Sequence, residues 1–100
     1  MSGDPTAMDD PCIKQAITAV ANSVRKEACQ RAGLLSRAQG IELDVKQMTA
    51  WLWGEEARLD FISRITPIIA AGMKNEDVDG MWHQLVSDWS ARLLQMEVRK

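Results

Sequence analysis

Apolar residues recur along this chain at the three- and four-residue steps of an α-helix, and nowhere do they alternate with period two over the length of a strand. No segment repeats another, and 100 residues is about the size of one domain, enough to bury roughly two-thirds of the unfolded surface. Hydrophobic residues make up 46% of the chain and charged residues 26%, an ordinary globular composition. The sequence therefore predicts an all-α fold, a small bundle of four or five helices.

The domain is expected to begin close to the N-terminus. Residues 1–9 are small, polar and contain Pro and Gly, so we expect a disordered N-terminal tail followed by a single helical domain over residues 10–100. Asp10 followed by Pro11 is a typical helix start, because the carboxylate can accept hydrogen bonds from free N–H groups and proline loses none at the first helical position.

The first predicted helix has an inward stripe at steps of four, three and four, made of Ile13, Ile17, Val20 and Val24. Its end is left open by the pattern, which allows a stop or bend at Gly33 or a longer helix to Ala38 with Gly40 as its stop. Cys12 and Cys29 would lie about 25 Å apart on this helix, whereas a disulfide needs Cα atoms within roughly 7 Å. The two cysteines are therefore not expected to pair within it.

A second helix is predicted to begin after Asp44. Asp44 is a suitable cap, and Leu43 and Met48 occupy the two positions of a hydrophobic staple on either side of it. Val45, Met48 and Leu52 then form the expected inner stripe.

Two tryptophans near the end of this helix, Trp51 and Trp53, point about 200° away from each other on a helical wheel. Trp51 lies roughly 85° from the centre of the inner stripe and Trp53 roughly 115°, so Trp53 is predicted to project outward. Leu59 and Ile62 continue the same stripe, and we expect the chain to bend near Gly54. A sharper bend could instead let both indoles pack inside.

The C-terminal half is predicted to contain further helices. Thr66 and Pro67 should end the one that follows Gly54, and a short buried helix with the sequence PIIAA should then run to Gly72. The clearest helix comes last, with Trp82 and Trp89 expected as core anchors seven residues apart. Its full apolar face is Val78, Trp82, Leu85, Val86, Trp89, Leu93 and Met96.

The segment NEDVDG resembles the start of a calcium-binding loop. Asn75, Asp77, Asp79 and Gly80 match its first, third, fifth and sixth positions, but Val86 stands where the twelfth position must supply a carboxylate. The acidic residues are better explained as the first turn of a helix, where the macrodipole favours negative charge. No metal site is therefore predicted here.

Other catalytic and ligand-binding motifs are missing from the sequence. His83 has no metal-ligand spacing and is expected to pair with Asp79 on the surface. No GxSxG segment, cysteine–histidine neighbourhood or Gly-rich loop after a strand is present, so we predict neither an enzyme nor a cofactor.

The charge and hydropathy of the chain bear on its partners. The formal net charge is −2 with Lys and Arg scattered, so we expect no direct, specific binding to nucleic acid. No apolar run reaches 10 residues and the N-terminus lacks the features of a signal peptide, which predicts a cytoplasmic protein without a membrane partner. The pattern gives no prediction of oligomeric state.

A helix-turn-helix DNA-binding regulator is the alternative. The segment LLSRAQGIELDVKQMTAWLWG has the outline of that motif, and Lys46 and Gln47 could face DNA. Val45 and Met48 come five and eight positions after Gly40, however, whereas that family usually places its inward residues at about six and nine. The two glutamates after the second helix would also repel phosphate.

A partly exposed tryptophan beside mixed charge is typical of a protein-binding hot spot. In size, composition and lack of catalytic motifs, the chain resembles the small inhibitor proteins of bacteriophages and mobile elements, of which anti-CRISPR proteins are one group. This resemblance implies a non-catalytic module that docks on a larger nucleoprotein complex and blocks access of nucleic acid. The predicted protein-binding residues are Trp53, Glu55, Glu56, Glu76, Asp77 and Asp79.

Overall fold

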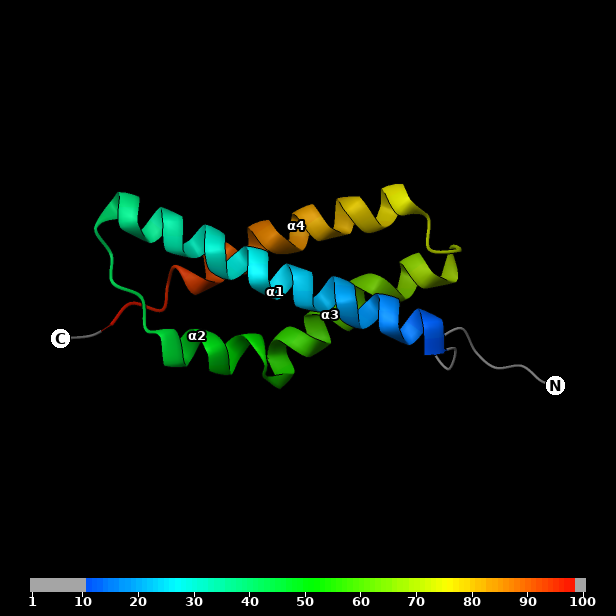
Figure 1. The fold of residues 1–100 in the computed structure, drawn as a ribbon, viewed down its shortest axis with the longest axis horizontal. Helices are drawn as coiled ribbons and strands as arrows, with labels where there is room; N and C mark the ends of the chain where they lie inside the picture. The colour runs from blue at the N-terminus through cyan, green and yellow to red at the C-terminus, as the bar shows by residue number, and fades with distance from the viewer. Residues whose placement is uncertain (1–10, 99–100) are drawn as a thin grey trace.

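The computed structural model describes residues 11–98, which form four helices: α1 (Pro11–Gln39), α2 (Val45–Leu52), α3 (Glu55–Ala70) and α4 (Asn75–Leu93). α1 and α4 lie side by side and run in the same direction, and α3 runs back along α4 (Figure 1). The predicted all-α bundle is confirmed. The expected tail over residues 1–9 and the expected cap Asp10 lie outside the described residues.

α1 is one helix of 29 residues, roughly 43 Å long, so the longer of its two expected ends is the observed one. It passes through Gly33 without a break and stops before Gly40. Gly40 has a φ of +70°, a left-handed conformation that glycine adopts without steric cost, and its N–H donates to the carbonyl of Arg37 at 3.3 Å.

The buried face of α1 is only partly the predicted stripe. Val24 is fully buried, Ile17 and Val20 are half-buried against the core, and Ile13 is half-buried. Small side chains that the apolar pattern did not single out complete this face: Ala21 lies within the predicted stripe, and Ala28, Ala32 and Ser36 extend it toward the C-terminal end of α1. Small side chains on α1 leave room for the large apolar residues of α4 that pack beside them.

α4 presents most of its predicted apolar face to the core. Five of the seven residues predicted for this face are buried, namely Leu85, Val86, Trp89, Leu93 and, just past the helix end, Met96. Met81 and Ser90 of α4 are buried as well. Trp89 is 1% exposed, which confirms it as a core anchor. The same expectation is wrong for Trp82, which is only half-buried and packs against the outside of the core.

α2 begins as predicted but buries less of its stripe. The Asp44 carboxylate accepts a hydrogen bond from the Gln47 backbone N–H at 3.1 Å and caps the helix. Met48 and Leu52 are buried, whereas Val45 is 68% exposed and its predicted place in the inner stripe is wrong. α2 has only about two turns. Met48 and Leu52, four residues apart on one side of the helix, reach the core, whereas Val45 at the start of the helix does not.

The predicted bend at Gly54 is confirmed. α2 ends at Leu52, and Gly54 is the extended N-cap residue of α3, with φ −90° and ψ −178°. The bend resets the helical phase, so Leu59 is 53% exposed and does not continue the stripe, while Ile62 is only half-buried. The buried residues of α3 are Ala57, Phe61 and Ile65.

Pro67 does not end α3, contrary to the prediction, and the first four residues of PIIAA are the last part of this helix, with Ala71 as its C-cap, rather than a separate helix. Proline keeps a helical φ and removes only the hydrogen bond to the carbonyl of Ser63, an exposed residue whose carbonyl water can reach. The stop comes at Gly72, as predicted, with φ +98°. The next N–H, that of Met73, donates to the carbonyl of Ile68 at 2.8 Å.

The end of the described chain crosses the link between α1 and α2. Leu43 and Glu97 form an isolated antiparallel bridge, with Asp44 N–H donating to Met96 O at 2.8 Å and Val98 N–H donating to Glu42 O at 2.9 Å. These bonds hold the start of α2 against the C-terminal end of α4. Among residues 11–98, no helix combines the length and the apolar character needed to cross a bilayer.

Candidate protein-binding surfaces

Trp53 projects from the corner between α2 and α3 with 64% of its surface exposed, which confirms its predicted outward direction. The ring is nevertheless held, because the Arg25 guanidinium of α1 lies over it, 4.3 Å from the centroid. Arg25 is itself fixed: its Nε donates to Leu52 O at 2.9 Å and its Nη1 to Asn22 Oδ1 at 3.0 Å. Partial burial lowers the pKa of Arg25, which stays a cation at neutral pH.

Trp51 packs toward the core, as expected, in an edge-to-face contact with Trp89 at 5.5 Å between ring centroids. Its indole N–H donates to Glu56 Oε2 at 2.9 Å, and the same oxygen pairs with Arg92 Nη2 at 2.9 Å. Glu56 was predicted as a protein-binding residue. Its carboxylate connects α2, α3 and α4, and 63% of the side chain remains exposed, so its binding role stays a prediction.

Glu55 follows Trp53 by two residues, in the first turn of α3, and is exposed. It forms an ion pair with Arg58 one turn later. The hydrogen bond from Arg58, with a smaller contribution from its charge, lowers the pKa of the Glu55 carboxyl. Glu55 therefore differs from Glu56. Its ion-pair partner, Arg58, is an exposed residue of the same helix, so this ion pair does not connect α3 to another helix.

The other predicted acidic residues lie at the start of α4. Glu76 and Asp77 are exposed in the first turn, which confirms the helix-start interpretation of NEDVDG, and Asp79 Oδ1 lies 3.6 Å from His83 Nε2, the predicted pair. Within residues 11–98 there is no group of three His, Cys, Asp or Glu side chains that could hold a metal ion. α3, about 24 Å long, separates this acidic turn from the corner, so the predicted residues form two surfaces.

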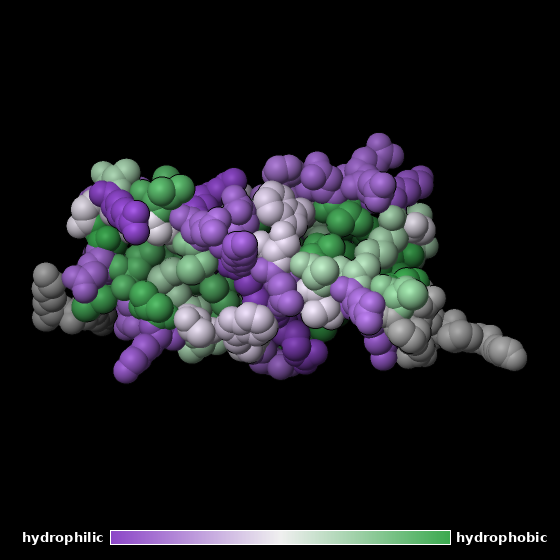
Figure 2. Space-filling view, in the orientation of Figure 1, coloured by the Kyte–Doolittle hydropathy of each residue, from purple (hydrophilic) through white to green (hydrophobic). Residues whose placement is uncertain are grey.

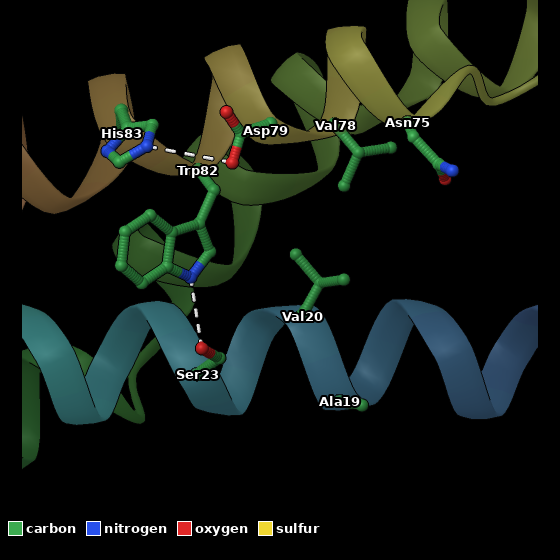
Figure 3. Close-up of a pocket in the computed structure, with 8 residues that line it drawn as sticks. All are labelled: Ala19, Val20, Ser23, Asn75, Val78, Asp79, Trp82 and His83. Atoms are coloured by element: carbon green, nitrogen blue, oxygen red, sulfur yellow. Dashed lines mark hydrogen bonds and ion pairs between the residues drawn. The ribbon is translucent and has the colours of Figure 1, made fainter.

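A groove of about 530 Å³ lies beside the acidic turn, between α1 and α4, and is called the α1–α4 groove below (Figure 3). Val20 and Val78 face each other across it, and the indole of Trp82 closes one end. The indole N–H donates to Ser23 Oγ at 3.0 Å. Ala19, Asn75, Asp79 and His83 complete the lining.

Sequence reasoning missed this groove because it assigned Val20, Val78 and Trp82 to the core. The spacing of these three residues is correct for an inward face. Ala19 and Ser23 of α1, however, are too small to fill the space between α1 and the first turns of α4. Sequence reasoning also missed Arg25, which meets Trp53 from a position 28 residues earlier in the chain. Nothing local in the sequence links the two.

Comparison of the chain with protein families, with curated proteins and with solved structures gave no match.

Proposed function

We propose that this protein is a non-catalytic protein-binding module that docks through the corner between α2 and α3. One observation carries the proposal: Trp53 is 64% exposed, yet its ring is held in place by the Arg25 guanidinium at 4.3 Å. Trp and Arg are enriched among the residues that supply most of the energy of protein interfaces. A side chain that is already ordered also loses less conformational entropy when a partner covers it.

The charge of the surrounding helices favours a basic partner. Residues 40–98, which include α2, α3 and α4, contain ten acidic and five basic residues, a formal net charge of −5, and Glu55 follows Trp53 by two residues. α1 supplies the cation that lies on the indole, Arg25. Lys and Arg that a nucleoprotein complex uses for phosphate contacts would be attracted to such a surface. We therefore propose an inhibitor of the anti-CRISPR type, which docks on a larger nucleoprotein complex in the cytoplasm and blocks access of nucleic acid.

The test is affinity purification of the tagged protein from host cells, with mass spectrometry of the retained proteins and an affinity measurement on the purified complex. Trp53→Ala should weaken that complex about thirtyfold, because burying a hot-spot tryptophan contributes about 2 kcal/mol or more. The melting temperature of the free Trp53→Ala protein should fall only slightly, since the lost cation–π contact with Arg25 is worth about 0.5–1 kcal/mol at an exposed site.

Val45→Ala is the matched control, because Val45 is also an exposed apolar residue, 68% exposed, at the other end of α2. It should leave the affinity unchanged. Equal affinity of Trp53→Ala and the parent, or weakening of the same size in the control, would show that the corner is not the docking surface.

The helix-turn-helix alternative has its own test. α1, the link and α2 keep the outline of that motif, and Lys46 and Gln47 of α2 are exposed. We expect duplex DNA to bind no more tightly than a non-specific level of about 10⁻⁴ M at physiological salt, because no basic cluster covers α2. A sequence-specific gel shift at nanomolar protein would establish the DNA-binding regulator instead.

A further inference from the structure

We infer that the α1–α4 groove is a second binding site, and that it takes an apolar side chain flanked by Lys or Arg on a segment of another protein. The site is independent of the corner that carries Trp53. Three properties of the groove support the assignment: its apolar floor, the fixed position of Trp82, and the sign of the charge at its rim.

The floor of the groove offers apolar surface that a ligand would remove from water. Its volume of about 530 Å³ falls within the range of roughly 300–1,000 Å³ common for binding pockets. Val20, Val78 and Trp82 are half-buried, so each keeps apolar area in contact with solvent. Figure 2 shows apolar surface on this side of the molecule, beneath the hydrophilic start of α4. Covering that surface is favourable in proportion to its area.

The groove is preformed. Trp82 is fixed from two sides, by the hydrogen bond of its indole N–H to Ser23 Oγ at 3.0 Å and by an edge-to-face contact with His83 at 5.0 Å. Both walls are regular helices, and Val20 and Val78 stand on facing turns of them (Figure 3). A ligand therefore meets an ordered pocket and need not order it, which lowers the entropic cost of binding.

The rim selects the charge of the ligand. Asp79 is the one carboxylate in the lining, and no Lys or Arg lines the groove among the residues described. Glu76 lies three residues before Asp79, about one turn earlier on α4, and adds a second exposed carboxylate near the rim, whereas Asp77 points away from Asp79. Lys or Arg beside the buried apolar side chain could pair with these carboxylates, whereas an acidic segment would be repelled.

The charge argument also separates the proposed ligand from the N-terminal segment of this chain. Residues 1–10 contain three Asp and no Lys or Arg, so they carry the same sign as the groove. A segment of a different protein, with the opposite sign, is the better complement.

The four tryptophans provide a direct test. Each indole N–H gives its own signal in a nitrogen–proton correlation NMR spectrum, and substitution of each Trp by Phe assigns it. Addition of a short, capped amphipathic peptide of leucine and lysine should move the Trp82 signal, while the Trp53 signal reports separately on the corner. The matching peptide of leucine and glutamate should move neither.

Two charge-reversal variants locate the interaction. Asp79→Lys should weaken binding of the leucine–lysine peptide about tenfold, as expected for loss of a close charge pair together with new repulsion. Glu42→Lys makes the same change in net charge in the link between α1 and α2, at the far end of α1, and should leave the affinity unchanged.

Several results would overturn the assignment. Equal binding of the two peptides would show that the charge of the groove does not select the ligand. A shift of the Trp53 signal alone would show that the peptide binds at the corner and not in the groove. A change of the Trp82 signal in Met8→Asp without peptide would show that residues 1–10 occupy the groove. Dependence of that signal on protein concentration would show that a second copy does. A shift of the Trp82 signal with the expected order of affinities would support the groove whether or not the Trp53 signal also moves.

Discussion

Trp51 and Trp53 have opposite environments because α2 turns by about 200° between them. Trp51 contacts Trp89 and donates its indole N–H to Glu56, whereas Trp53 is exposed under the Arg25 guanidinium. The direction of each side chain follows from helical geometry and could be predicted from the sequence. The partner Arg25 could not, because it reaches Trp53 only through the packing of α1 against the corner.

Gly54 is required at the corner for a steric reason. A Cβ atom built at this position would lie 2.7 Å from the carbonyl oxygen of Ala50, a backbone atom that cannot turn away. We expect Gly54→Ala to lower the free energy of unfolding by about 1–3 kcal/mol, the usual cost of forcing an atom into filled space. Urea denaturation followed by circular dichroism measures the loss.

Gly33→Ala serves as the comparison for that substitution. Gly33 lies inside α1, and beyond its chain neighbours and the nearby helix backbone no atom lies within 4 Å of a built Cβ, so alanine should stabilise the protein by about 0.5–1 kcal/mol through its higher helix propensity. A Gly54→Ala variant as stable as the parent would mean that the α2–α3 corner relaxes without cost.

α3 and α4 are joined by a row of polar contacts that no single helix pattern reveals. Asp60 accepts the indole N–H of Trp89 at 2.8 Å with one oxygen and pairs with Arg64 Nε at 3.0 Å with the other. Arg64 continues the row to Asp88 at 2.9 Å. Burial alone would lower the pKa of Arg64, but the hydrogen bonds and charges of Asp60 and Asp88 together raise it.

The two carboxylates in this row should differ in their effect on stability. Asp60→Ala leaves the N–H of the buried Trp89 without its acceptor and should cost about 2–3 kcal/mol. Asp88→Ala removes an ion pair whose carboxylate is 40% exposed and should cost less than about 1 kcal/mol. Chemical denaturation of both variants compares them, and equal losses would rule out a structural role for the Trp89–Asp60 bond.

Helix ends were predictable where the signal is local. The Asp44 cap, the stop at Gly72 and the bend at Gly54 all depend on backbone groups within a few residues, and each is confirmed. The sequence left the end of α1 open between Gly33 and Gly40, and the structure has the stop at Gly40. Pro67 is the exception, since α3 continues through it. Proline has no N–H to donate to the carbonyl of Ser63, but Ser63 is exposed and water can take the place of that donor. Proline ends a helix only when the lost hydrogen bond cannot be replaced.

The whole bundle depends on Trp89, which is 1% exposed and contacts side chains of more than one helix. Trp89→Ala should lower the free energy of unfolding by about 3–5 kcal/mol, comparable with the total stability of a small domain. Circular dichroism should then show a largely unfolded protein. A variant that melts like the parent would mean that α4 contributes little to the core.

The sequence by itself determined the fold class and several helix ends, and it favoured the bend at Gly54 and the outward direction of Trp53. Each depends on the helical period or on hydrogen bonds between residues close in the chain, so the information is local. The expected pair of His83 and Asp79 is predictable for the same reason, because the two residues are one turn apart on α4.

Only the tertiary structure decided which apolar positions are buried and where surfaces form. Val45 and Leu59 fit a stripe but face solvent, whereas Ala28 and Ala32 are fully buried because α4 packs against them. Trp82 has the spacing of a core residue and lines a groove, since the small residues of α1 opposite it leave space. Burial is a property of two elements in contact, and the period of one helix does not specify its partner.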